Sequence, residues 1–353
     1  MAIPDLLAGL LATPGPSGHE SRPAAVWRDW CKAFTDEVDV DHAGSSWARV
    51  AGNAGGPTLM VVGHIDEIGV HVTHIDDNGF LKFGTIGFPD PIVMVGQRIV
   101  LDTKGGPVVG VIARKAVHLL DVTEHRAIPP LSDFCIDIGA TSGDDARSRV
   151  RIGDAGVIDV APIELPNGRV VSRALDNRAG CYVVARAAQL LTQGDGPPGD
   201  FLAVAGVQEE IGFLGGSRTS AFRHKPDVAI AVDTTHATDS PGVALGQTTK
   251  HSFESGPVLV RGTALNPRVF ELMHDTAERE GIPFTVESIS GMTRTDADAI
   301  HVSRAGVPTG LVSIPIRYMH SPVEMVALPD LEASAKLIAA FARALTSHTS
   351  FAR

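Results

Sequence analysis

Cysteine is scarce in this chain, which has three among 353 residues. Cys31, Cys135 and Cys181 lie far apart and do not form the close pairs that zinc ribbons and redox-active dithiols require. We therefore expect buried free thiols in a reducing compartment, which makes a cytoplasmic protein the best interpretation.

Basic charge is also in short supply. Lys and Arg number 30 against 41 Asp and Glu, which gives a formal net charge of -11. The sequence has no basic run that could follow a phosphate backbone. Nucleic acid is therefore not expected as a partner.

Long hydrophobic runs are missing, because Gly, Pro, His and charged residues interrupt every apolar segment before it reaches membrane-spanning length. The apolar stretch near the start has no basic residue ahead of its leucines, unlike a signal peptide. Its four leucines fit one face of a short packed helix: Leu6, Leu7, Leu10 and Leu11. We expect no membrane partner.

The composition is otherwise that of an ordinary folded protein, with 44% hydrophobic and 20% charged residues. At this length we expect two domains. The segment 68–160 contains many short Val, Ile and Gly-rich runs separated by turns such as Asp77-Asn78-Gly79, a pattern typical of β-hairpins. We interpret it as a small β-rich domain inserted into a main domain formed by 1–67 and 161–353.

In the main domain, helical and apolar strand patterns alternate. Helices are expected at 3–12, 177–192, 214–222, 266–280, 295–304 and 329–346, and a further helix that ends at about Phe34 is expected after the first one. Strands are expected at 58–63, 201–207, 227–232, 257–260, 284–289 and 309–314. This alternation predicts an α/β fold, a layered and mostly parallel sheet with helices on both faces. Functional sites in such sheets lie beyond the carboxyl ends of the strands.

Polar residues follow several of these apolar runs or begin the next helix: His64, Asp66, Asp176, Glu209, Glu210, Asp233 and His320. Imidazoles and carboxylates are ligands that divalent Zn, Co or Mn accept, and an aspartate can bridge two ions. Any one of them alone is more often a helix cap or a turn former. Glu209 and Glu210 are more informative, because two adjacent acids would repel in a buried site unless a cation held them or solvent surrounded them.

Five motifs in order, GHIDEIG (63–69), ALDNRAG (174–180), VQEEIG (207–212), AVDTTHATDSPG (231–242) and RYMHSPVE (317–324), resemble those of metallopeptidase family 42. This family contains the tetrahedral and glutamyl aminopeptidase-like enzymes, and the resemblance extends over essentially the whole chain. It implies a phosphorylase/hydrolase-like peptidase domain with an inserted PDZ-like domain. It also implies a metal-dependent aminopeptidase that removes N-terminal residues from short peptides.

Carried over motif by motif, the resemblance implies two divalent metal ions per subunit, which could be Zn, Co or Mn. Asp176 would bridge them, Glu210 and His320 would complete one ion, and His64 and Asp233 the other. Glu209 would be the catalytic acid and base acting on the metal-bridged water, and Asp66 the carboxylate that orients His64.

Two arginines offer a place for an acidic substrate group. Arg294 lies in GMTRTDADAIH (291–301), which resembles the family's cleft-bordering segment but is interrupted by Met292 and Arg294. Arg317 opens the RYMHSPVE motif. Each could bind a carboxylate in a bidentate fork, but pairing with a structural carboxylate such as Asp296 or Glu324 is slightly favoured. Asp239, in THATDSPG, is expected to be a turn former.

Two other functions compete with the peptidase. A glycoside hydrolase also uses paired acids, but its carboxylates face each other across a sugar at roughly 5 to 9.5 Å, and the aromatic content of 5% provides few platforms for sugar stacking. An inactive, shell-forming peptide-binding protein would not need a complete ligand set. Strand edges left uncovered in 68–160 would favour pairing between copies, so we expect a closed homo-oligomer. The resemblance implies that this oligomer is a homododecamer built from dimers.

Overall fold

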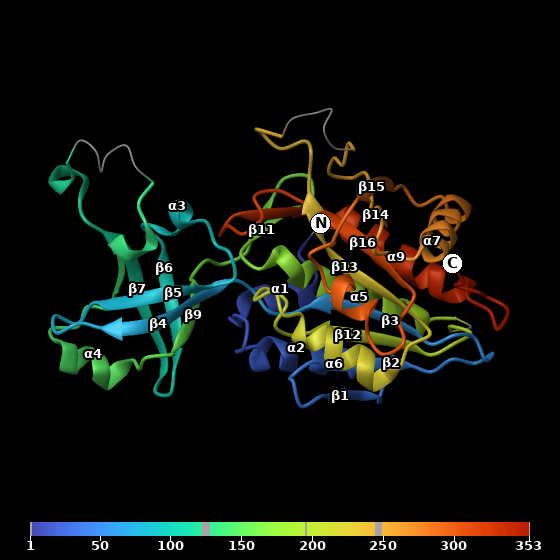
Figure 1. Cartoon of the computed structure of the whole chain (residues 1–353), viewed down its shortest axis with the longest axis horizontal. Coiled ribbons are helices and arrows are strands. Elements are labelled where there is room, and N and C mark those ends of the chain that lie inside the picture. Colours follow the sequence, from blue (N-terminus) through green and yellow to red (C-terminus); the bar gives the residue numbers. More distant parts are fainter. Residues whose placement is uncertain (1, 122–127, 195, 244–248, 353) are drawn as a thin grey trace.

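An eight-stranded sheet forms the centre of the larger part of the molecule in the computed structural model, which describes residues 2–121, 128–194, 196–243 and 249–352 (Figure 1). Its strands lie in the order β1 (Val38–Val40), β2 (Ser46–Val50), β12 (Phe201–Gly206), β3 (Leu59–His64), β13 (Val228–His236), β16 (Thr309–Ile316), β14 (Val258–Gly262) and β15 (Thr285–Ile289). The four central strands, β12, β3, β13 and β16, are parallel to one another. Their carboxyl ends therefore meet at one edge of the sheet.

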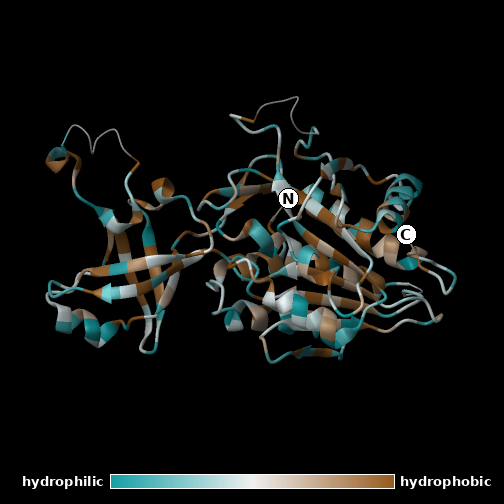
Figure 2. Cartoon of the chain, in the orientation of Figure 1, coloured by the Kyte–Doolittle hydropathy of each residue, from teal (hydrophilic) through white to brown (hydrophobic). Residues whose placement is uncertain are grey.

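The central strands are apolar because helices cover both faces of the sheet. Leu59 and Val61 of β3 pack into one core and Met60 and Val62 into another, and all four are buried. The first core also receives α1 (Asp5–Ala12), α2 (Ser21–Cys31), α5 (Leu175–Leu191), α7 (Pro267–Glu280) and α9 (Leu328–Ala344); the second receives α6 (Gly215–His224) and α8 (Ala297–Ile300). Figure 2 shows the hydrophobic residues concentrated along these strands. The predicted α/β class is confirmed.

No helix in the described part of the chain is both long enough and apolar enough to cross a membrane.

The smaller part is a closed antiparallel barrel, set beside the main sheet (Figure 1). Its strands are ordered β4 (Gly69–Ile75), β5 (Leu81–Ile86), β8 (Phe134–Asp137), β7 (Gly106–Arg114), β6 (Arg98–Thr103) and β9 (Ala155–Ile158). The same region contains α3 (Pro91–Met94), α4 (Gly143–Arg149) and the 3-10 turns η1 (Val117–Leu119) and η2 (Leu131–Asp133). The prediction of uncovered strand edges in this segment is wrong, because each strand of the closed barrel is paired on both sides. We propose the domain boundaries 67/68 and 160/161 on this basis.

A small antiparallel sheet lies where the chain returns from the barrel. It consists of β10 (Ile163–Leu165), β11 (Arg169–Ser172) and β17 (Glu324–Ala327) in that order. Its register places Ser172 opposite Glu324. The segment that follows β16 is thereby brought next to the start of α5.

Two predicted elements differ from the structure. Strand β13 continues past the expected end at 232 to His236, because it stays paired with β16 after its pairing with β3 ends at Ala231. The helix expected at 295–304 is short, Ala297–Ile300. Arg304 has a φ of 57°, in the left-handed region, so the helix cannot extend to its expected end.

All three cysteines are free, as expected. Cys31 and Cys181 are buried, but the expected burial is wrong for Cys135, which is half-buried. Phe134 and Ile136 belong to the barrel core, so alternation along β8 turns Cys135 outward.

A buried ion cluster joins the N-terminal segment to the sheet and to α5. Arg178 is fully buried and donates to Glu67 at 2.8 Å, and Glu67 also pairs with Arg173. The Arg178 guanidinium donates to three backbone carbonyls, those of Leu10, Thr13 and Ile65. The cluster therefore links the end of α1, the residue that follows β3 and the first turn of α5.

We predict that Arg178→Met lowers the free energy of unfolding by about 3 to 5 kcal/mol, because it leaves two buried carbonyls, the part-buried carbonyl of Thr13 and one oxygen of Glu67 without this donor. Urea unfolding of the metal-free protein measures this. Arg186→Met is the matched control, since Arg186 pairs with the half-exposed Glu332 and its loss should cost less than about 1 kcal/mol. Equal losses in the two variants would contradict the role given to the cluster.

Candidate metal centre

The carboxyl edge of the central strands gathers the polar residues that the sequence singles out. They come from four strands and one helix: His64 ends β3, Glu209 and Glu210 follow β12, Asp233 lies in β13, His320 follows β16, and Asp176 lies in the first turn of α5. Asp233 lies two residues past Ala231, the last β13 residue that pairs with β3. The two strands are no longer paired at this point, and the Asp233 side chain lines the cleft there. All six line one cleft of about 620 Å³.

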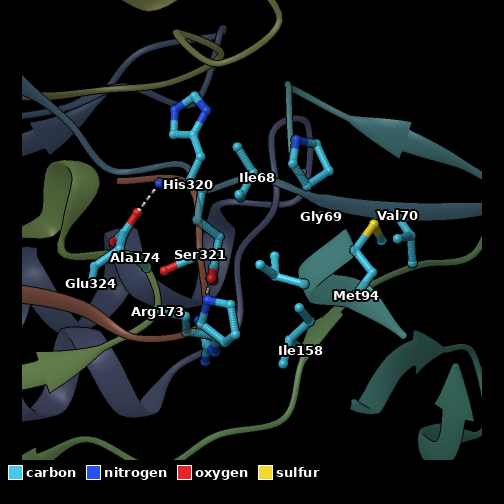
Figure 3. Close-up of a pocket in the computed structure, with 14 residues that line it drawn as sticks. Ile68, Gly69, Val70, Met94, Ile158, Arg173, Ala174, His320, Ser321 and Glu324 are labelled. Carbon is cyan, nitrogen blue, oxygen red and sulfur yellow. Dashed lines mark hydrogen bonds and ion pairs between the residues drawn. The ribbon is translucent and has the colours of Figure 1, made fainter. Parts of the chain in front are cut away.

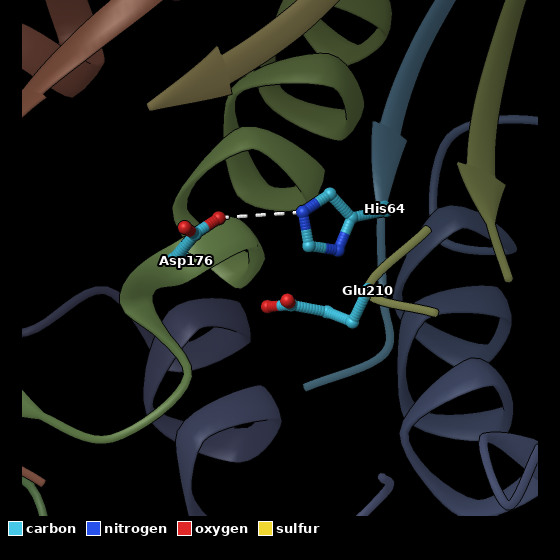
Figure 4. Close-up of side chains that lie close together, drawn as sticks. All are labelled: His64, Asp176 and Glu210. Atoms are coloured by element: carbon cyan, nitrogen blue, oxygen red, sulfur yellow. Dashed lines mark ion pairs between the residues drawn. The ribbon is translucent and has the colours of Figure 1, made fainter. Parts of the chain in front are cut away.

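Asp176 lies between the two histidines. Its Oδ1 is 3.3 Å from Nε2 of His64, and its Oδ2 is 3.5 Å from Nε2 of His320. Glu210 Oε2 is 3.4 Å from the same His320 nitrogen. Figure 4 shows His64, Asp176 and Glu210 converging, and one potential ligand atom from each lies within 4.8 Å of the others. This group could hold a metal ion.

Glu209 and Asp233 approach the same nitrogen of His64 as Asp176 does. Glu209 Oε2 lies 3.8 Å and Asp233 Oδ1 lies 3.9 Å from Nε2 of His64. The carboxylates therefore form two groups around the shared Asp176: Asp233 with Glu209 near His64, and Glu210 near His320.

Asp66 connects His64 to the loop that carries the paired glutamates. Its Oδ1 lies 3.4 Å from Nδ1 of His64, and its carboxylate accepts the backbone N–H groups of Glu209 at 3.2 Å and Glu210 at 3.0 Å. Ser17, which the sequence analysis does not single out, donates to Oδ2 at 2.5 Å. Burial by itself raises the pKa of Asp66, but His64 and these donors together lower the pKa below its usual value.

The start of α5 is held against β3 and β13 by small and polar residues. The Asn177 side chain donates to the Val232 carbonyl at 2.7 Å and accepts from the Gly180 amide at 3.0 Å. A Cβ on Gly63 would lie 2.8 Å from the carbonyl carbon of Gly180, so only glycine allows this approach. These contacts fix where Asp176 enters the cleft.

Glu324 is a further residue that sequence reasoning misses, since it entered only as a possible partner of Arg317. It is buried, and its two carboxylate oxygens accept the backbone N–H groups of Asp176 at 3.0 Å and His320 at 2.8 Å. The sequence feature that could have identified Glu324 is its position in the RYMHSPVE motif, four residues after His320. Glu324 thus ties together two candidate ligands from distant parts of the chain.

Buried negative charge dominates the electrostatics of the cleft. Burial raises the pKa of Glu209 to about 9 and that of Asp233 to about 8, and the charge of Asp176 adds to both shifts. Burial and Asp176 also raise the pKa of Glu210 well above its usual value. Burial lowers the pKa of His64, but the nearby carboxylates outweigh this and raise it.

The two arginines differ in position. Arg294 lines the cleft, and in the described part of the chain it forms no ion pair with Asp296. Arg317 is held outside the cleft lining, where it pairs with Asp239 at 2.7 Å and lies 4.2 Å from the ring centre of Phe253. The structural carboxylate is therefore Asp239 instead of Glu324 or Asp296.

Comparison with known proteins identifies the family. The sequence profile of the M42 glutamyl aminopeptidase family matches residues 44–337. A putative aminopeptidase of Acetivibrio thermocellus is 38% identical over 341 residues, covering 95% of this chain and 96% of that protein.

Two solved structures share the whole fold. A TET aminopeptidase from a marine sediment Thaumarchaeota archaeon superposes with a TM-score of 0.90 at 34% identity, covering 97% of both chains. The TET1 peptidase of Pyrococcus horikoshii, which can assemble into a tetrahedron or a large octahedral shell, superposes with a TM-score of 0.85 at 30% identity, covering 97% of this chain and 99% of that one. Sequence profile, relatives and fold agree, and the chain belongs to the M42 family of aminopeptidases.

Proposed function

We propose that the protein is a dinuclear metal-dependent aminopeptidase that removes N-terminal residues from short peptides. The observation that carries this proposal is the position of Asp176, whose two oxygens face different histidines at 3.3 and 3.5 Å. A carboxylate placed in this way suits a bridge between two cations. Asp176 with His64 and Asp233 would hold one ion, and Asp176 with His320 and Glu210 would hold the other.

The donor set fits such ions. Glu210 Oε1 is a buried acceptor with no hydrogen-bond partner among the described residues. Two divalent cations would give this oxygen a partner. They would also lower the raised pKa values of Glu209, Glu210 and Asp233, which favours the ionised carboxylates. Mixed imidazole and carboxylate ligands suit Zn, Co or Mn.

Two such ions, when bound, would lower the pKa of a water molecule and polarise the scissile carbonyl. Glu209 is placed to receive the proton of the attacking water and to return it to the leaving amine. With 11% of its side chain exposed, Glu209 reaches the cleft without being freely solvated. Asp66 and Glu324 position the ligands through the backbone.

A substrate with a free N-terminal amine could place that amine on one of the two ions, which would hold the peptide by its N-terminus. This is the property that distinguishes an exopeptidase from an endopeptidase.

A glycoside hydrolase is less well supported. Glu209, Asp176 and Asp233 all lie within 3.9 Å of one nitrogen, Nε2 of His64. Acids that converge on one point suit cations better than two opposite faces of a sugar ring.

We also propose a closed homo-oligomer, with the tetrahedral dodecamer as its form, by analogy with the TET1 peptidase of Pyrococcus horikoshii. Exposed apolar side chains on the barrel support it, namely those of Ile92, Val109, Val111, Val117 and Leu119. The three free cysteines support a reducing, cytoplasmic location.

We predict that Glu209→Gln retains both metal ions but loses about 10² to 10⁴ in kcat, because only the proton carrier is removed. Metal analysis and hydrolysis of aminoacyl chromogenic substrates test this. Glu210→Gln is the matched control and should weaken the binding of one ion. Normal turnover of Glu209→Gln with two ions bound would refute the assignment.

From the position of Arg294 in the cleft, we predict that the enzyme prefers substrates with acidic or neutral N-terminal residues over those with Lys or Arg. We expect Arg294→Ala to lower kcat/KM for a glutamyl substrate about tenfold relative to a leucyl one, because a charge-assisted hydrogen bond is lost. Arg317→Ala should leave this ratio unchanged, since Asp239 already holds Arg317. Faster release of Lys than of Glu or Leu by the unmodified enzyme would overturn the prediction.

We predict that light scattering at micromolar concentration, with metal present, gives the mass of twelve chains. A monomer mass would refute the assembly altogether, whereas a stable dimer would refute only the shell. If the active sites face an enclosed space, activity on folded proteins should be small compared with activity on short peptides.

A further inference from the structure

We infer that the barrel segment Gly87–Phe88 is a positioning element of the metal centre, which orients His320 and packs against Glu210. The inference rests on the proposed binding of one cation by these two residues. It assigns to the barrel a direct part in holding that ion, in addition to any part in assembly.

The backbone of Phe88 determines which nitrogen of His320 is free. Nδ1 of His320 lies 3.2 Å from the Phe88 carbonyl oxygen. A carbonyl only accepts, so Nδ1 must carry the proton. The lone pair is then on Nε2, the nitrogen that faces Asp176 and Glu210 at 3.5 and 3.4 Å. This is the tautomer and the orientation that a metal ligand needs.

The two histidines of the centre are therefore held by different parts of the molecule. His64 has the Asp66 carboxylate near its Nδ1, and both residues belong to the peptidase part. His320 has a backbone carbonyl from the segment after barrel strand β5. The barrel thus acts on only one of the two proposed ions.

Gly87 makes the second contact. Its φ is +72°, and a Cβ built on it would lie 2.7 Å from Cγ2 of Ile68 and 3.4 Å from both the carbonyl oxygen and Oε2 of Glu210. The backbone at Gly87 therefore lies next to Glu210, and an added methyl group would touch Glu210 and clash with Ile68. The positive φ also disfavours any side chain at this position, so the substitution should shift the segment. Pro89 restricts Phe88 to extended conformations, which helps to aim its carbonyl.

The seam behind this segment is closely packed. Figure 3 shows the small cavity between His320 and the barrel side chains Val70, Met94 and Ile158, and its volume is only about 30 Å³. The lining is mostly apolar, so the barrel and the His320 loop are held in contact there without room for a ligand larger than water. A displacement of the segment would be transmitted to His320.

The Phe88 side chain itself is not needed for this role. It is 78% exposed and lines the cleft, whereas the hydrogen bond comes from the backbone. Replacement of the ring should therefore affect substrate binding and leave metal binding intact.

Titration of the metal-free protein with Co²⁺, followed by isothermal calorimetry and by the visible absorption of bound Co²⁺, tests the inference. The unmodified protein should bind two ions per subunit. Gly87→Ala should weaken one of them about tenfold or more and leave the other unchanged. Gly96→Ala is the matched control, because Gly96 has a φ of +82° in the same barrel but no atom within 4 Å of the added Cβ. It and Phe88→Ala should bind both ions normally.

The outcomes separate the two proposals. Failure of the unmodified protein to bind two Co²⁺ ions would refute the dinuclear site. Two normal ions in Gly87→Ala, or equal weakening of both, would overturn the role of the segment while leaving the site intact. Should Gly87→Ala not fold, Pro89→Gly replaces it, since it loosens the segment without adding an atom. Selective weakening of one ion supports the inference there too, and unchanged binding overturns it.

Discussion

Repulsion between buried carboxylates is the constraint on which the rest of this structure depends. Asp176, Glu209 and Asp233 all approach one nitrogen of His64 within 3.9 Å, and an oxygen of Glu210 lies within 4.8 Å of the same group. In a site largely closed to water, their charges oppose folding unless cations and fixed donors offset them. The raised pKa values of Glu209 and Asp233 express this opposition, with burial as the largest cause.

The protein meets this constraint with hydrogen bonds that hold the backbone of the site residues in place. Asp66 accepts the amides of Glu209 and Glu210, and Glu324 accepts those of Asp176 and His320. Asp66 thereby sets the position of Glu209, the proposed proton carrier, and of the adjacent candidate ligand Glu210. Glu324 sets the position of two candidate ligands from separate elements. The Glu67 and Arg178 cluster then ties the same edge of the sheet to α1. Buried polar groups whose hydrogen bonds are all satisfied in this way hold the site in one arrangement.

The barrel and the peptidase part meet at this same edge. The barrel supplies Phe88 to the cleft lining and to His320, while its exposed valines on β7 lie elsewhere on its surface. The proposed role of the barrel at the active site and its proposed role in assembly therefore involve different parts of its surface.

Sequence alone determined the α/β class, the alternation of helices and strands, the β-rich character of 68–160 and the group of acids and histidines at strand ends, because these depend on local periodicity and on motifs such as VQEEIG and RYMHSPVE. It did not reveal that Asp233 lies inside a longer strand, that Arg317 is held by Asp239, or that the barrel closes. Nor did it assign roles to Glu324, Ser17 or Phe88, which are hydrogen-bonded to Asp176, Asp66 and His320 at separations of 148, 49 and 232 residues along the chain. Only the tertiary structure decided these pairings, because a hydrogen bond between distant segments leaves no periodic trace in the sequence of either one.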